Sequence, residues 1–175
     1  MQLTIDDRDA VRVPEGFDAF FHAHFASVAR AAALVAGDPA TGQDLAQDAF
    51  LRLLQRWESM RSREHARNFV YKVAINLARS HLRKHLRLVP SGLHHADRVA
   101  AAGEAPGEGS SSVADALADL SPRQRACVVL VDLVGMDSGE VARVLSINAN
   151  TVRVHVMRGR AALRARLGME ERDEA

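Results

Sequence analysis

The chain has little of several features that would place it in a particular class of protein. Its 175 residues include one cysteine, Cys127, so an internal disulfide framework is excluded and a small core residue in a reducing compartment is indicated. Aromatic residues make up only 5% of the chain. Residues 6–9 carry mixed charge where a leader would be basic and then apolar, and no apolar run approaches about 18 residues. We therefore expect a cytoplasmic protein without membrane insertion.

Strand patterns are also nearly absent, whereas apolar residues recur at helical spacing in every long segment. This pattern predicts an all-α fold. With 47% hydrophobic residues, the chain can bury one modest core or two small ones. Residues 90–112 are rich in Gly, Ala, Ser and acids, a composition that predicts a flexible linker. We expect two small helical domains, at residues 1–89 and 113–168, followed by an acidic tail at 169–175.

Three helices are predicted in the first domain. The first opens at Pro14 and Glu15, places several phenylalanines on one face, and ends at Gly37. The second runs from about residue 43 to 57, and a third follows an arginine-rich loop at 58–67 and runs to about residue 87. In the second domain, Ser121 and Gln124 form a capping-box pattern that begins a further helix.

The outer face of the second predicted helix is polar and acidic but includes a leucine. Its members follow the spacing i, i+3, i+4, i+7, i+11, and they are Asp44, Gln47, Asp48, Leu51 and Gln55. An acidic stripe with an exposed leucine has the form of a protein-docking surface. A face that is merely solvated has the same pattern, so the residues alone leave both interpretations open.

Basic residues are segregated, although the formal net charge is only +1. Residues 61–87 hold eight lysines and arginines against one acid, Glu64, and residues 153–166 hold five arginines and no acid. Two separate basic surfaces indicate a polyanion that is contacted at two places. Solvated helical faces are again the simpler alternative.

A helix-turn-helix pattern lies near the C-terminus. Asp137 can cap a short helix with buried Val141 and Val144, and Asn148 can cap a second helix with a basic outer face. The second helix is therefore predicted to enter a DNA groove. We expect base contacts from four residues near its start and phosphate contacts from two arginines further along. The first group is Asn150, Thr151, Arg153 and His155, and the second is Arg158 and Arg160.

The order of these features resembles an extracytoplasmic-function (ECF) sigma factor, over roughly residues 15–88 and 113–167. Residues 44–51 resemble the docking motif of that family, and residues 68–83 resemble its promoter-reading helix. The resemblance implies that the first domain binds the β′ clamp helices of core RNA polymerase and opens the minus-ten promoter element. It implies that the second domain reads the minus-thirty-five element and contacts the β flap.

The resemblance also suggests which residues contact the minus-ten element. The loop at 58–67 would hold an unstacked base, and the helix after it would supply amide and cationic groups. The expected residues are Arg61, Arg63, Arg67, Asn68, Lys72, Asn76, Arg79 and Arg83. Ser80, Ser146, Gly139 and Val154 depart from the family pattern, and Val154 bears on base readout.

The resemblance further implies an anti-sigma factor as a partner. Because the linker predicts loosely connected domains, we expect a free chain of broad conformation, which such an inhibitor would clamp by wedging between the domains. About 23 linker residues span at most ~80 Å, enough for the ~70 Å of two duplex turns.

Two other classes of protein were weighed. A conventional helix-turn-helix regulator accounts for the second domain, and it would prefer a palindromic site, but it leaves the acidic stripe and the first basic helix unexplained. His81 and His85 share a helix face, but neither a third ligand nor a glutamate accompanies them, so no metal site is predicted. No catalytic arrangement stands out either, and we expect neither an enzyme nor a cofactor.

Overall fold

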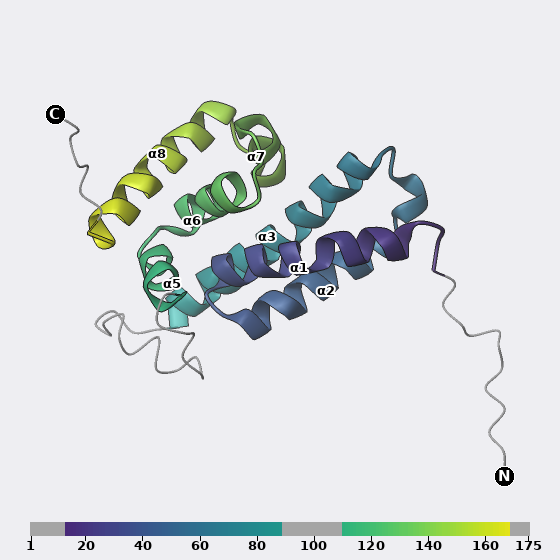
Figure 1. Cartoon of the computed structure of the whole chain (residues 1–175), viewed down its shortest axis with the longest axis horizontal. Helices are drawn as coiled ribbons and strands as arrows, with labels where there is room; N and C mark the ends of the chain where they lie inside the picture. Colours follow the sequence, from purple (N-terminus) through teal and green to yellow (C-terminus); the bar gives the residue numbers. More distant parts are fainter. Residues whose placement is uncertain (1–12, 89–109, 169–175) are drawn as a thin grey trace, which may run out of the picture.

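The computed structural model describes residues 13–88 and 110–168, and in these two stretches every regular element is helical (Figure 1). The all-α prediction is therefore confirmed. Three long helices come first, α1 (Phe17–Ala36), α2 (Pro39–Leu54) and α3 (Arg63–Leu88), with a short 3-10 turn η1 (Trp57–Ser59) before α3. They are followed by α5 (Ser110–Ala118), α6 (Pro122–Val128), the π-helical η2 (Val129–Leu133), α7 (Ser138–Leu145) and α8 (Ala149–Arg166).

The first three helices pack around an aromatic cluster and a very close helix crossing. Phe50 of α2 lies 5.0 to 6.5 Å, between ring centroids, from four phenylalanines of α1. Trp57 joins the cluster and donates its indole N–H to the carbonyl of Glu15 at 3.0 Å. At Gly42 the backbone of α2 lies against Ala33 of α1. Helix α2 is therefore held rigidly from its buried side.

Three predicted boundaries were wrong. Helix α2 begins at Pro39, four residues earlier than expected, because Asp38 caps it by accepting from the Thr41 N–H at 2.6 Å. It ends at Leu54, so Trp57 belongs to the following 3-10 turn. Helix α3 begins at Arg63, so the second half of the predicted loop at 58–67 is α-helical. Ser62 accepts from the His65 N–H at 3.1 Å, which is the capping contact that moves this boundary.

The second set of helices contains the predicted helix-turn-helix. Reciprocal capping boxes start α6 at Ser121 with Gln124 and α7 at Asp137 with Glu140, and Asn148 caps α8. These three caps confirm the sequence analysis. The turn between α7 and α8 passes through Ser146 in the left-handed conformation, φ 54°, which is the position where a glycine is common. Helix α5 begins at Ser110, so it includes the last three residues of the predicted linker, most of which lies outside the described residues.

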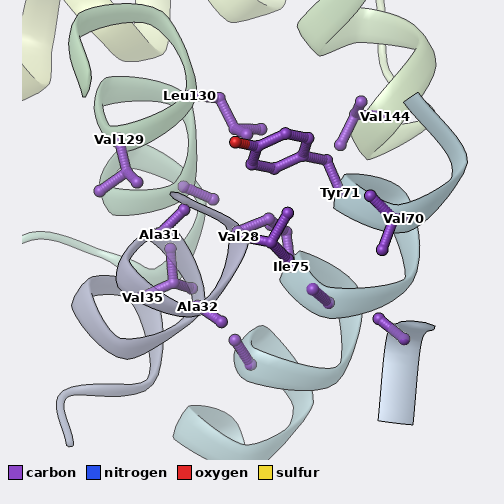
Figure 2. Packing of buried hydrophobic residues seen from close by; sticks show 14 of the residues in the cluster. Val28, Ala31, Ala32, Val35, Val70, Tyr71, Ile75, Val129, Leu130 and Val144 are labelled. Atoms are coloured by element: carbon purple, nitrogen blue, oxygen red, sulfur yellow. The ribbon is translucent and has the colours of Figure 1, made fainter. Parts of the chain in front are cut away.

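The two sets of helices pack together in one core (Figure 1). Helix α3 contacts α6 and α7, and α1 contacts α6 and η2. Figure 2 shows the Tyr71 ring of α3 beside Leu130 and Val144 of the second set, and Tyr71 is 2% exposed. This closed arrangement differs from the loosely connected domains that the linker composition led us to expect.

The closed arrangement also includes a buried cation. Arg125 of α6 is 3% exposed and donates to the carbonyl of Val35, in the last turn of α1, at 3.3 Å. Burial lowers the pKa of Arg125 to about 10. The last carbonyls of a helix carry partial negative charge, so they suit a guanidinium. The contact therefore ties the second domain to the end of α1.

Helix α1 is long and apolar enough to cross a membrane by length and composition alone. In this fold eight of its residues are buried in the core, among them Phe20, Val28 and Val35. Its apolar character is thus accounted for by packing against the other helices.

Candidate protein-docking and nucleic-acid interfaces

The acidic stripe of α2 lies on one exposed face of that helix. All five of its predicted members are exposed, and Leu51 is 58% exposed although it is a large apolar residue. The opposite face buries Ala46, Phe50 and Leu53. Asp48 lies 3.2 Å from Arg52, an exposed pair within the helix, which is worth little in water. The stripe thus has a rigid base and side chains free to contact a partner.

The basic residues of α3 divide into a group on one face and a group with other partners. Five of the eight predicted residues share a face by the spacing i, i+4, i+8, i+11, i+15. They are Asn68, Lys72, Asn76, Arg79 and Arg83. Lys72 and Arg83 are exposed, whereas Asn76 is half-buried and accepts from Arg79 at 3.3 Å. Arg61 is exposed just before the helix.

Arg63 and Arg67, which were predicted to contact nucleic acid, form hydrogen bonds within the protein. Arg63 donates to the Gly16 carbonyl at 2.8 Å, and its guanidinium lies over the Trp57 ring at 5.1 Å. Arg67 donates to the Val134 carbonyl at 3.3 Å and lies 3.5 Å from Glu140 of α7. Neither arginine is directed with the five residues of the α3 face. Arg67 belongs to the contact between the domains.

The same contact lies against the edge of the α3 face. The Oδ1 of Asn68 and the Nε of Arg79 are buried and have no hydrogen-bond partner among the described residues. Burial lowers the pKa of Arg79, and the charges of Arg83 and Arg123 lower it further. Unsatisfied buried polar atoms are destabilising. The α3 face is therefore partly covered in the closed arrangement, and its covered edge would gain partners in water or on a ligand.

Helix α8 presents its predicted reading residues near its start. Asn150, Thr151 and Arg153 are exposed, and Arg153 donates to the Asn150 side chain at 2.6 Å. Arg158 is exposed on the neighbouring flank. The first three residues lie at the end of the helix that a helix-turn-helix inserts into the major groove, and Arg158 lies about two turns further along.

His155 and Arg160 are the two predicted α8 residues that lie against other helices. His155 is half-buried beside α3 and α6, and its Nδ1 has no hydrogen-bond partner in the described part of the chain. Burial lowers its pKa, and the charge of Arg123 adds to this, so the ring is neutral at pH 7. Arg160 forms a two-contact ion pair with Asp132 of η2, with one contact at 3.2 Å. Both residues depend on tertiary partners that the sequence did not reveal.

Two apolar residues lie on the exposed side of α8, of which the sequence analysis noted Val154 as a departure from the family pattern and passed over Met157. Val154 is 40% exposed and Met157 is 64% exposed. Met157 borders an open groove of about 360 Å³ whose rim carries Arg153, Arg160 and Arg164. Helical spacing could have shown this exposure. Val152, Val156 and Gly159 form the core face of α8, and Val154 and Met157 lie on the opposite side of the helix.

His81 and His85 lie with their ring centroids 4.6 Å apart. Within residues 13–88 and 110–168, no group of three or more His, Cys, Asp and Glu is placed to hold a metal ion.

Comparison with known families agrees with this arrangement. The family model for sigma-70 region 2 matches residues 20–88, and the model for sigma-70 region 4 matches residues 110–163. The RNA polymerase sigma-E factor of Streptomyces antibioticus is 32% identical over 137 residues, which cover 78% of this chain and 76% of that protein. The ECF RNA polymerase sigma factor SigM of Mycobacterium tuberculosis is 30% identical over 156 residues, 87% of this chain and 77% of the relative.

Solved structures with the same fold include two recorded with a partner protein. The sigma factor RpoE in complex with the anti-sigma factor NepR, from Bartonella quintana, has a TM-score of 0.70 at 19% identity and covers 89% of this chain and 98% of its own. CnrH in complex with the cytosolic domain of CnrY has a TM-score of 0.65 at 24% identity and covers 89% of each chain. Both support the fold.

The chain belongs to the extracytoplasmic-function group of the sigma-70 family. It is a sigma factor, which binds core RNA polymerase and promoter DNA and directs promoter-specific initiation of transcription. Proteins of this family are initiation factors and not enzymes. The operator-binding regulator is thereby set aside, because the region 2 match covers the very helices that this alternative left unexplained.

Proposed function

We propose that three surfaces of this sigma factor divide the work of initiation. The acidic stripe of α2 binds the β′ clamp helices of core polymerase, the α3 face contacts the minus-ten element, and α8 reads the minus-thirty-five element while its domain contacts the β flap. The observation that carries the proposal is the exposure of all five stripe residues on one side of a helix whose other side is fully packed. Leu51, 58% exposed, adds to this polar face an apolar side chain that a docked partner would cover.

The domain assignment follows from the same surfaces. We place the polymerase and minus-ten domain at residues 1–89 and the minus-thirty-five domain up to residue 168, with its start moved from residue 113 to Ser110, where α5 begins. The minus-ten set has five residues on the α3 face, which are Asn68, Lys72, Asn76, Arg79 and Arg83. Arg61 lies beside this face. Arg63 and Arg67 also belong to the set, but they form hydrogen bonds within the protein.

We also propose a cytoplasmic location, where core polymerase works, and regulation by an anti-sigma factor. Support for the latter comes from the Bartonella relative, whose structure contains such a partner. Because the two domains already contact each other through Tyr71, Arg67 and Arg125, an inhibitor here would stabilise the closed arrangement from outside instead of wedging the domains apart.

Replacing Asp48 with Arg tests the docking surface. The substitution reverses a charge at the centre of the stripe, and Asp48→Arg should therefore reduce capture of core polymerase by the folded full chain at least tenfold. Asp18→Arg is the matched control, since Asp18 is an exposed acid of α1 outside the stripe. Equal capture by wild type and Asp48→Arg, with both proteins folded, would remove the stripe from the interface.

A further inference from the structure

The most outward line of α8 is apolar after its first turn. Asn150, Val154, Met157 and Ala161 follow the spacing i, i+4, i+7, i+11, and all four are exposed. They lie directly opposite the buried residues Val152, Val156 and Gly159 of the same helix. Val154 and Met157 therefore occupy the centre of the surface that a groove-bound helix turns toward the bases.

Arginines flank this apolar line. Arg153, Arg160 and Arg164 lie along the groove on one side of it, and Arg158 is exposed on the other side. Arginines on both sides match the two phosphate backbones that border a major groove. This arrangement of charge favours nucleic acid over an apolar protein surface as the occupant of the line.

The chemistry of the major groove limits what two aliphatic side chains can recognise. Neither Val154 nor Met157 has a group that forms a strong hydrogen bond, so they cannot pair with the N7, O6, N6, N4 or O4 atoms that distinguish most base edges. The 5-methyl group of thymine is the one apolar group on those edges. Facing any other base edge, these side chains would cover polar atoms without satisfying them.

The hydrogen bonds of Asn150 limit which of its groups can contact DNA. Its Oδ1 already accepts from Arg153 at 2.6 Å, and its backbone N–H is used by the Asn148 cap at 2.8 Å. Within this arrangement the Asn150 amide group keeps its N–H donors for a base or phosphate. Val154 and Met157 follow Asn150 one and two turns further along the same line, and they offer only apolar contacts.

We propose that Val154 and Met157 select thymines in the minus-thirty-five element by packing against their 5-methyl groups. This inference rests on the proposed function, in which α8 enters the major groove of that element. Val154, the position that departs from the family pattern, then sets part of the promoter preference of this particular chain.

Deoxyuridine substitution provides the test, because it removes only the methyl group of a thymine. The duplex would be selected from a random library by the full chain bound to core polymerase, and each thymine of the upstream element then replaced singly. We expect one or two replacements to weaken binding about fourfold each, the factor for ~0.8 kcal/mol per buried methyl-sized group. In Val154→Ala or Met157→Ala, deoxyuridine at the thymine that the lost side chain contacted should no longer weaken binding, because the side chain that packs against the methyl group has been removed.

Val113→Ala is the control variant, because it shortens an exposed valine that belongs to α5 and not to the outward line of α8. It should leave the full deoxyuridine effect in place. If no replacement weakens binding while Arg153→Ala still does, the methyl readout is wrong and the groove assignment stands. If neither matters, both fail. Weaker polymerase capture by Val154→Ala, with unchanged duplex binding, would assign the line to a protein partner and overturn the inference.

Discussion

Gly42 shows how one residue sets the distance between two helices. A Cβ placed on it would lie 2.4 Å from the Ala33 Cβ and 2.5 Å from both the Cα and the N of Ala33. Backbone atoms cannot move aside as the end of a long side chain can. The close crossing of α1 and α2 depends on the absence of a side chain at this point. The position of the acidic stripe of α2 depends on it as well.

Gly42→Ala should therefore destabilise the chain even though alanine favours helix formation. We expect a loss of about 2 kcal/mol in the free energy of unfolding, because overpacking against backbone atoms should cost about 3 kcal/mol, the upper end of the usual range, and helix propensity offsets about 1 kcal/mol. Urea denaturation measures it. Adding Ala33→Gly removes the Cβ contact but leaves the two backbone contacts, so it should rescue only a part. Wild-type stability of Gly42→Ala would contradict the close crossing.

At the residue scale, the sequence was a good guide wherever helical spacing alone decides exposure. Asp44, Asp48 and Leu51 lie on the face that their spacing predicted. Arg63 and Arg160 stay predicted nucleic-acid contacts, but the sequence did not show their intramolecular partners, the Gly16 carbonyl and Asp132, which come from distant parts of the chain. Such tertiary partners leave no local pattern in a sequence.

At the scale of the element, helix starts were predicted best where the sequence shows both members of a reciprocal capping box. Asp137 accepts from the backbone N–H groups of Gly139 and Glu140 at 2.7 and 2.8 Å, and Glu140 returns a contact to the Asp137 N–H at 2.9 Å. Residue types and spacing suffice to recognise this box. The start of α3 was missed because the arginines there were interpreted as a loop and Ser62 was not considered as a cap.

The cap of α7 should make part of the stability depend on pH. Hydrogen bonds from the Glu140 and Gly139 N–H groups hold the pKa of Asp137 below its ordinary 3.8. A lowered folded pKa means stability that is present above the unfolded value and is lost as the pH falls through the folded value. The melting-temperature difference between wild type and Asp137→Asn should therefore shrink as the pH drops below about 3.8. A difference that stays constant down to pH 2 would contradict this account.

At the scale of the whole molecule, the sequence predicted both domains but not the contact between them. Tyr71, Leu130 and Val144 each look like ordinary core residues of their own helices, and nothing local shows that they meet. Composition alone also made the intervening residues look like a linker that would keep the domains apart. The closed arrangement is a property of nonlocal packing.

The closed arrangement affects the three proposed surfaces differently. The stripe of α2 and the outward line of α8 remain exposed, whereas Arg67 and the edge of the α3 face are covered. Two DNA-reading faces on domains in direct contact also cannot engage promoter elements two duplex turns apart, ~70 Å. Docking on polymerase is therefore compatible with the closed form, while reading a whole promoter requires the domains to separate.

Arg125→Glu should open the molecule. It replaces a buried cation at the end of α1 with a carboxylate facing the Val35 carbonyl, where like partial charges repel and burial of the charge is unfavourable. Spin labels at Ala26→Cys and Ala161→Cys, in a Cys127→Ala background, report the distance between the domains. We expect one narrow distance in the parent and a longer, broader distribution in Arg125→Glu.

Arg30→Glu is the control for this experiment, because it makes the same charge change at an exposed position of α1. It should keep the narrow distance. A broad distribution in the parent protein, or an unchanged one in folded Arg125→Glu, would show that Arg125 does not hold the domains together.

Cys127 allows the opening of the domain contact to be measured chemically. It is the only cysteine of the chain, it is fully buried, and burial raises its pKa to about 11, so at neutral pH it is a protonated thiol out of reach of solvent. The nearby charge of Arg79, from the other domain, places it close to the contact. A thiol reagent can therefore modify the native protein only during opening events, and the rate of that modification in unlabelled protein measures how often the molecule opens.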